Sequence, residues 1–86
     1  MPFVYILQNE KGKYYIGSTV NLEDRIRHHF GGYTPSTKRL GNLKLVFSQE
    51  YNFLKEARSV ELKLKKLKRR DYIANIIKDG FVKIKP

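Results

Sequence analysis

The sequence predicts a small α/β (α+β) domain whose elements run in the order β-β-α-β-α-α. Three observations predict this order. Two short runs of apolar and aromatic residues flank a turn, a third such run follows later, and other segments carry apolar residues at spacings of three and four. The chain has 86 residues and no cysteine. We therefore expect a single domain, residues 1–86, with a thin core and no disulfide or thiolate-bound zinc.

Two strands are predicted near the N-terminus, over residues 3–7 and 14–18. Both runs are rich in aromatic and β-branched residues, which favour strands. Residues 9–12 between them have turn chemistry and include a glycine that can take a positive φ. The two strands are therefore expected to form a hairpin.

The hairpin carries two tyrosines and a glycine whose positions need an explanation. Alternate strand residues share a face, so Tyr5 is expected to lie roughly opposite Tyr15 or Ile16. The two tyrosine hydroxyls would then meet over one face of the sheet. Gly17 is unusual, because glycine weakens a strand unless another group must approach closely.

A first helix is predicted after the hairpin. Asn21 is a good N-cap, and Asp24 suits the positive end of a helix. Its apolar stripe consists of Leu22, Ile26 and Phe30. Residues 31–43, which begin with two glycines, are expected to end this helix and to form a loop.

The second half of the chain predicts one strand and two helices. Residues 44–51 have the composition of a third strand. A long helix is expected over residues 54–68, because its apolar residues are spaced by three and four. A final helix is expected over residues 70–78, and residues 81–85 form a short strand or a tail.

The charge of the chain favours a polyanionic partner. Eighteen Lys and Arg stand against eight Asp and Glu, which gives a formal net charge of +10. Over half of this excess lies between residues 55 and 70. Nucleic acid is the partner we expect, and an anionic membrane surface or ribosomal RNA is the alternative.

The sequence favours a cytoplasmic protein without a membrane segment. Its apolar runs are far shorter than the roughly 20 residues of a membrane-spanning helix. The N-terminus has neither a basic segment before its apolar run nor a small-residue cleavage site, so we expect no signal peptide. The absence of cysteine fits a reducing compartment.

Glu61 is the most informative single residue for chemistry. It lies four residues after Ala57 and three before Leu64, inside the apolar stripe of the long predicted helix. A carboxylate facing a core costs on the order of a few kcal/mol unless it is paired or binds a metal ion. The alternative is a glutamate at the edge of the stripe, paired with one of the many Lys or Arg residues.

Arg25 and His29 lie four residues apart on the flank of the first predicted helix. An arginine can hold a phosphate through its forked donors, and a histidine can move a proton near neutral pH. The alternative is an ordinary solvated flank of an amphipathic helix. The two adjacent histidines, without cysteine, do not form a zinc site.

Four short motifs occur in order along the chain. The first keeps a tyrosine in Phe3-Val4-Tyr5, and the second is Tyr15-Ile16-Gly17. Asn-Leu-x-x-Arg occupies residues 21–25, and Glu-Ala-x-x-x-Glu-x-x-x-Lys occupies residues 56–65. Their order and spacing resemble the GIY-YIG nuclease superfamily, most closely its small single-domain members. The resemblance runs from about residue 2 to residue 79.

The resemblance implies both a fold and an activity. The implied fold is a small three-stranded antiparallel sheet flanked by helices, and the implied activity is metal-dependent hydrolysis of DNA phosphodiester bonds. The residues it places in one catalytic site are Tyr5, Tyr15, Arg25, His29 and Glu61. Gly17 would let the backbone or a phosphate come close. Several relatives carry a lysine after the second motif, where this chain has Ser18-Thr19.

The chemistry of the reaction assigns roles to these residues. One carboxylate is too few for a two-metal clamp, so we expect a single Mg²⁺ or Mn²⁺ on Glu61. Arg25 would hold a non-bridging phosphate oxygen. Tyr5 or Tyr15 would position or deprotonate the attacking water, although a free tyrosine has a pKa of about 10. His29 is the alternative base.

The residues expected to contact nucleic acid are Gly17, Lys63, Lys66, Arg69 and Arg70. The alternative to an endonuclease is a catalytically inactive basic module that binds nucleic acid, and a structural role on RNA is a third hypothesis. Weak specificity, recognition of branched or damaged DNA, and reliance on a homodimer or a recruiting protein are alternatives. DNA repair, mobile-element spread and defence are alternative pathways.

Overall fold

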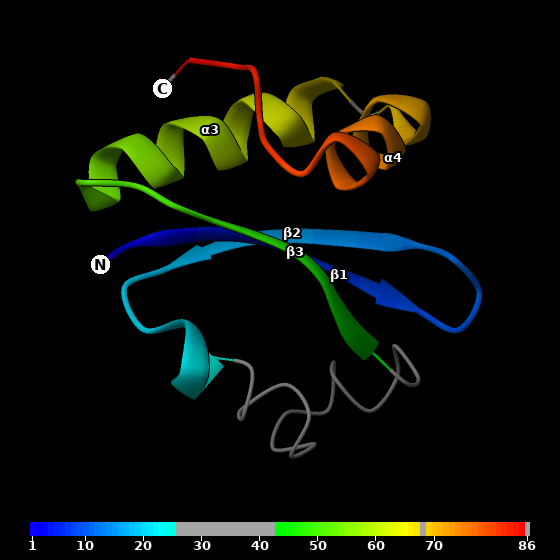
Figure 1. Ribbon diagram of the computed structural model, residues 1–86, viewed down its shortest axis with the longest axis horizontal. Helices are drawn as coiled ribbons and strands as arrows, with labels where there is room; N and C mark the ends of the chain where they lie inside the picture. The colour runs from blue at the N-terminus through cyan, green and yellow to red at the C-terminus, as the bar shows by residue number, and fades with distance from the viewer. Residues whose placement is uncertain (26–42, 68, 86) are drawn as a thin grey trace.

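The computed structural model describes residues 1–25, 43–67 and 69–85. The strands and helices bounded within these residues are β1 (Phe3–Asn9), β2 (Tyr14–Thr19), β3 (Leu43–Glu50), α3 (Leu54–Leu67) and α4 (Arg70–Asp79). Helical residues 22–25 follow β2, before α3 and α4 (Figure 1). The predicted order β-β-α-β-α-α is confirmed. Residues 81–85 form no strand.

A three-stranded antiparallel sheet forms the centre of the protein, as predicted. The strand order is β2-β1-β3, so β1 lies in the middle and β2 is an edge strand. Helices α3 and α4 cover one face of the sheet, and helical residues 22–25 lie on the other side (Figure 1). Helix α3 packs against β2 and β1.

The β1–β2 turn sets the register of the hairpin. The Asn9 side chain accepts hydrogen bonds from the backbone N–H of Lys11 at 3.0 Å and of Lys13 at 2.8 Å. The Asn9 N–H donates to the Lys13 carbonyl at 3.0 Å, and Gly12 has φ of 87°. The ladder therefore continues to Asn9, and the turn begins later than the sequence suggested.

This later turn shifts the pairing of the tyrosines. Tyr5 lies opposite Gly17, and Tyr15 lies opposite Leu7. The expectation that Tyr5 faces Tyr15 or Ile16 is therefore wrong by one or two residues. Because directly paired residues share a face, Tyr5 and Gly17 are on the same side of the sheet.

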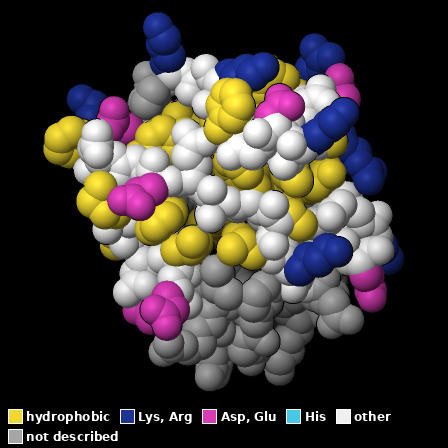
Figure 2. Space-filling view, in the orientation of Figure 1, with side chains coloured by type: hydrophobic (Ala, Val, Ile, Leu, Met, Phe, Trp, Pro, Cys, Tyr) yellow, Lys and Arg dark blue, Asp and Glu magenta, His cyan; other side chains and the backbone are white. Residues whose placement is uncertain are grey.

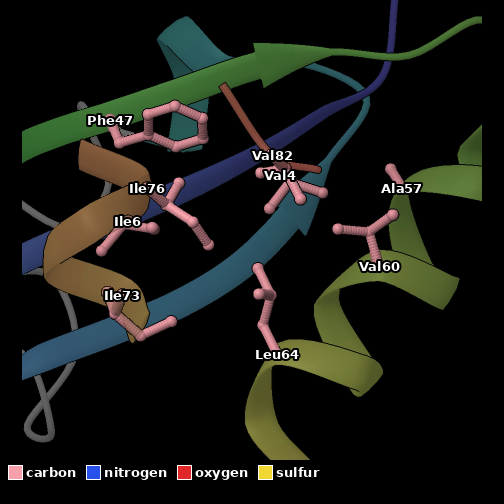
Figure 3. Close-up of a cluster of buried hydrophobic side chains, with 9 residues drawn as sticks. All are labelled: Val4, Ile6, Phe47, Ala57, Val60, Leu64, Ile73, Ile76 and Val82. Carbon is pink, nitrogen blue, oxygen red and sulfur yellow. The ribbon is translucent and has the colours of Figure 1, made fainter. Parts of the chain in front are cut away.

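The hydrophobic core lies between the sheet and helices α3 and α4 (Figure 3). Alternate residues of β1 point into it, and Ile6 is fully buried there. Helix α3 contributes a stripe at spacings of three and four, as its sequence predicts. The core residues are Val4, Ile6, Phe47, Ala57, Val60, Leu64, Ile73, Ile76 and Val82.

Gly17 provides the space through which the Tyr5 side chain passes. A Cβ atom built on Gly17 would lie 2.5 Å from Tyr5 Cζ and 3.0 Å from Tyr5 Cε1. Non-bonded carbon atoms prefer about 3.5–4.0 Å, so a side chain at this position cannot coexist with the ring. The glycine therefore allows the Tyr5 ring to lie across β2, and this explains a residue that weakens a strand.

Gly17→Ala is expected to destabilise the protein by about 1–3 kcal/mol, because the new methyl group overlaps the Tyr5 ring. Urea unfolding of the single variant and of Gly17→Ala/Tyr5→Leu measures the effect. The shorter leucine leaves room for the methyl group, so the double variant should lose less stability than the sum of the two single variants. Additive losses would contradict the overlap.

Candidate active site

Tyr5 lies at the middle of the sheet and reaches toward its edge. Its side chain starts on the central strand β1 and crosses Gly17 of β2, and the residue is only 6% exposed. Burial raises the pKa of Tyr5; the Arg25 guanidinium opposes this rise, and the Glu61 carboxylate adds to it. Two opposite charges from two different helical segments therefore act on one phenol.

Glu61 lies between α3 and the edge strand β2. Its Oε1 accepts a hydrogen bond from the Ser18 hydroxyl, and its Oε2 is 2.6 Å from Lys65 Nζ. The Glu61 side chain is 18% exposed. Both interpretations of the sequence therefore hold in part: the carboxylate faces the sheet, and it is also paired with a lysine one turn later.

Arg25 is positioned by the N-terminus of the helical segment after β2. The Asn21 side chain accepts a hydrogen bond from the Asp24 N–H at 3.1 Å and donates to the Asp24 carboxylate at 3.0 Å. The Arg25 N–H donates to the Asn21 carbonyl at 3.1 Å. The predicted N-cap is confirmed, and it orients the first turn. Arg25 is exposed and lines a hollow with Thr19.

Tyr15 and His29 have different outcomes. Tyr15 is half-buried, and Lys13 Nζ lies 5.5 Å from the centroid of its ring. Tyr15 pairs with Leu7, which lies two residues after Tyr5 on β1, so Tyr15 and Tyr5 are on the same face of the sheet. His29 lies outside the described residues, so its predicted place near the phosphate stays a prediction.

The residues expected to contact nucleic acid do not form one surface. Arg69 and Arg70 line a cleft between β2 and the junction of α3 with α4. Lys63 instead donates a hydrogen bond to the Lys85 carbonyl at 2.8 Å, and Lys66 is exposed. Lys and Arg side chains gather along the upper and right-hand rim of the molecule, where Figure 1 shows the helices and the β1–β2 turn (Figure 2). Gly17 serves the close approach of Tyr5.

The sequence alone assigns no function to Ser18, Lys13 or Lys65. Ser18 departs from the lysine of several relatives, yet its hydroxyl donates a hydrogen bond to the Glu61 carboxylate. The Lys65 contact had a visible signal, because a glutamate four residues before a lysine on a helix forms a favourable pair. The contact of Lys13 with Tyr15 had no signal beyond their places on one strand.

The residues around Glu61 fit a hydrated divalent cation and do not fit a fully protein-ligated one. No group of three or more His, Cys, Asp or Glu side chains gathers among the described residues. Mg²⁺ commonly keeps several waters and binds one or two carboxylates together with substrate phosphates. Glu61 can supply one such carboxylate, although Lys65 contacts one of its oxygens.

Comparison with known proteins establishes the family. The GIY-YIG catalytic domain family matches residues 1–74. The chain belongs to the GIY-YIG family. The GIY-YIG domain defines a superfamily of nucleases, and its presence implies a nucleic-acid substrate for this chain. The resemblance identified from the four motifs is thereby confirmed.

GIY-YIG relatives of similar size match most of this chain. A UPF0213 protein of Clostridium perfringens is 40% identical over 70 residues, covering 80% of this chain and 75% of its own. One from Streptococcus pneumoniae is 34% identical over 68 residues, covering 78% and 69%. The solution NMR structure of a UPF0213 protein from Bacillus halodurans has a TM-score of 0.58 at 30% identity, covering 93% of this chain and 87% of that chain.

These comparisons support the GIY-YIG fold and leave the chemistry of the individual side chains to the geometry. The names of the relatives state no activity. No helix within the described part of the chain is long and apolar enough to cross a membrane.

The raised pKa of Tyr5 predicts a specific dependence of stability on pH. A folded-state pKa above the unfolded value of about 10 means that folding favours the protonated phenol. This contribution is complete below about pH 10 and is lost as the pH rises through the folded-state pKa. Tyr5→Phe cannot ionise, so the stability of the unaltered protein relative to this variant should fall as the pH rises above about 10.

Urea unfolding of both proteins at a series of alkaline pH values measures this difference. A difference that stays constant across the series would show that Tyr5 ionises in the folded protein as it does in the unfolded chain.

Proposed function

We propose that this protein is a metal-dependent endonuclease that hydrolyses DNA phosphodiester bonds. The proposal is supported by two observations: the Tyr5 ring crosses Gly17 of the edge strand, and Arg25 and Glu61 shift the pKa of this phenol in opposite directions. A phenol, a guanidinium and a carboxylate are the groups that phosphodiester hydrolysis can use to position water, neutralise the phosphate and hold a cation. Membership of the GIY-YIG family supports the same conclusion.

Arg25 is the proposed phosphate ligand. It is exposed, and the capped helical turn at Asn21 fixes its backbone. The planar guanidinium can donate two parallel hydrogen bonds to non-bridging phosphate oxygens, which a lysine cannot do. Because Arg25 also acts on the Tyr5 hydroxyl, a phosphate held by Arg25 would lie close to this phenol.

Tyr5 is proposed to act as a hydrogen-bond donor in its protonated form. Its raised pKa keeps the proton on the phenol at neutral pH. The hydroxyl can therefore orient the attacking water or donate to a phosphate oxygen. The proton acceptor is then Tyr15 or His29, the two other candidates that the sequence offers for this role.

Glu61 is the proposed ligand of one Mg²⁺ or Mn²⁺ ion. Such an ion, when bound, neutralises charge on the phosphate and stabilises the leaving oxygen. The Ser18 hydroxyl fixes one carboxylate oxygen of Glu61, so the side chain is oriented before any cation arrives. Lys65 contacts the other oxygen and would have to move away for this oxygen to bind a cation.

The alternative function is a catalytically inactive module that binds nucleic acid. The ion pair between Glu61 and Lys65 favours it, because a purely structural glutamate would be satisfied in the same way. Both functions would use the same basic surface, so only a measurement of DNA cleavage distinguishes the endonuclease from the inactive module.

The proposed setting is the cytoplasm, which suits a chain without cysteine. Branched or damaged DNA is the proposed substrate, and DNA repair is one of the pathways in which such a substrate occurs. Cleavage of both strands by a chain with one site requires either a homodimer or two successive encounters with the DNA, and a recruiting protein is the alternative partner.

Plasmid nicking tests the proposed activity. With Mg²⁺ or Mn²⁺ the protein should convert supercoiled plasmid to the nicked form, and EDTA should stop the reaction. Glu61→Gln keeps the size of the side chain and removes its charge, so the rate should fall on the order of a hundredfold. Glu50→Gln is the matched control, because Glu50 is exposed on the opposite edge strand β3.

Nicking that persists in Glu61→Gln would contradict the assigned site. No nicking of plasmid or branched DNA by the unaltered protein, with DNA binding intact, would support the inactive module.

Metal affinity tests the role of Lys65 without measuring activity. Its ammonium group competes with a cation for the Glu61 carboxylate, so Lys65→Met should bind Mn²⁺ about two- to fivefold more tightly, as expected for an ion pair worth up to about 1 kcal/mol. Electron paramagnetic resonance of free Mn²⁺ measures the affinity. Lys55→Met removes an equal charge from an exposed position of the same helix. Equal Mn²⁺ affinities for the two variants would contradict competition at Glu61.

A further inference from the structure

A cleft lies beside the candidate site. It has a volume of about 760 Å³ and lies between β2 and the junction of α3 with α4. The hairpin contributes Lys11, Lys13, Tyr14, Tyr15 and Ile16 to its walls. The helices contribute Leu64, Lys65, Arg69, Arg70 and Ile73. This basic-aromatic cleft includes two residues next to the proposed catalytic chemistry, Tyr15 and Lys65.

The charge of the basic-aromatic cleft is entirely positive. Half of its lining residues are Lys or Arg, and none is acidic. Lys65 is paired with Glu61, and Arg69 is paired with Asp71 at 2.8 Å. Within the described part of the chain, the other three cations of the cleft make no ion pair with a carboxylate. The charge of this cleft therefore favours an anionic ligand.

The remaining walls of the basic-aromatic cleft are aromatic and aliphatic. Tyr14 and Tyr15 are both half-buried, so each keeps part of its ring accessible. Arg70 Cζ lies 5.8 Å from the centroid of the Tyr14 ring, and Lys13 Nζ lies 5.5 Å from that of Tyr15. Each ring is thus held next to a cation. A ligand that fits this arrangement offers a flat apolar surface together with an anion.

Duplex DNA does not offer that combination. Its bases are stacked and paired inside the helix, so its outer surface presents phosphates and narrow base edges. An unpaired strand exposes both faces of each base beside a phosphate. Aromatic side chains in a positively charged groove are the features that single-strand binding proteins use.

The hairpin turn is contacted by Arg70, one of the residues that line the basic-aromatic cleft. A Cβ atom built on Gly12 would lie 2.7 Å from Arg70 Nη2, so the start of α4 packs directly on the turn. Gly12 has a positive φ of 87°, which also disfavours other residues there. The Arg70 side chain therefore connects the start of α4 to the hairpin turn.

We propose that the basic-aromatic cleft binds unpaired nucleotides of a DNA strand, next to the phosphodiester bond that is hydrolysed at the candidate site. This inference rests on the proposed function for the choice of DNA. Tyr14 stacks on a base, and Lys11, Lys13 and Arg70 contact phosphates. The protein then selects branched or single-stranded DNA, because a continuous duplex leaves the aromatic wall unused.

Fluorescence anisotropy in EDTA tests the proposal without any requirement for cleavage. The probes are a labelled oligothymidine of about ten nucleotides and a blunt duplex of equal length. The unaltered protein should bind the single strand more tightly. Tyr14→Leu should weaken single-strand binding about tenfold and leave duplex binding nearly unchanged, because the variant loses only base stacking. Tyr14→Phe keeps the ring and should retain the affinity.

A second variant guards against a folding defect at Tyr14, which packs against the core. Lys13 is exposed, so Lys13→Gln should fold normally, weaken single-strand binding and reduce its dependence on salt. Lys55→Gln, an equal loss of charge at an exposed position of α3, should change binding less.

Three results would overturn the proposal. They are tighter binding of duplex than of single strand, equal losses for both probes in Tyr14→Leu, and tighter binding of an oligouridine than of the oligothymidine. Because the measurement excludes metal, its outcome is independent of nicking. Single-strand binding without nicking would refute the proposed function alone, and nicking without single-strand preference would refute this inference alone.

Discussion

The close passage of the Tyr5 ring across Gly17 is the constraint on which the rest of the candidate site depends. A residue in the central strand of a sheet normally cannot bring its polar end to the sheet edge, because the neighbouring strand carries side chains on the same face. Removal of one Cβ atom from β2 opens that path. The phenol thus has its ring buried and its hydroxyl under the influence of two charged groups.

Consecutive residues of the edge strand β2 contribute both to the candidate active site and to the basic-aromatic cleft. On one face of β2 the Ser18 hydroxyl donates a hydrogen bond to Glu61. On the other face Gly17 makes room for the Tyr5 ring, because neighbouring strand residues point to opposite sides. Further along, the tyrosines of the same strand form a wall of the basic-aromatic cleft. An edge strand suits this role because one of its sides has no neighbouring strand in the described sheet. Helix α3 supplies Glu61 and Lys65 from above that edge.

The sequence was sufficient to predict the elements and their order. Alternation, helical spacing and the Asn21 cap are local signals, and local signals determine where strands and helices form. The predicted partner of Tyr5 is wrong by one or two residues, because the register of the hairpin depends on which residue ends the β1–β2 hydrogen bonds. The Asn9 side chain decides this through two hydrogen bonds that no periodicity reveals.

The candidate site was predictable in part, for a similar reason. Glu61 was identifiable as a candidate because a carboxylate is unexpected within the apolar stripe of a helix. Ser18 and Lys13 were not identifiable, because a serine or a lysine is common on an edge strand. Lys63 and Arg70 looked equivalent as charges in one run, yet helical geometry sends Lys63 to the C-terminal segment and Arg70 to the hairpin turn. Charge composition indicated a polyanionic partner, and only the packing indicates which cations face the same space.

The contact between Gly12 and Arg70 joins the first turn of the chain to its last helix, and this has a consequence for biosynthesis. The hairpin precedes α4 along the chain, so a ribosome synthesises the hairpin first. The tyrosines of β2 are therefore synthesised before the helix that completes the basic-aromatic cleft. A nascent chain carries the aromatic wall without the guanidinium beside Tyr14. Both walls of the cleft are therefore present together only after α4 has been synthesised and has packed against the hairpin.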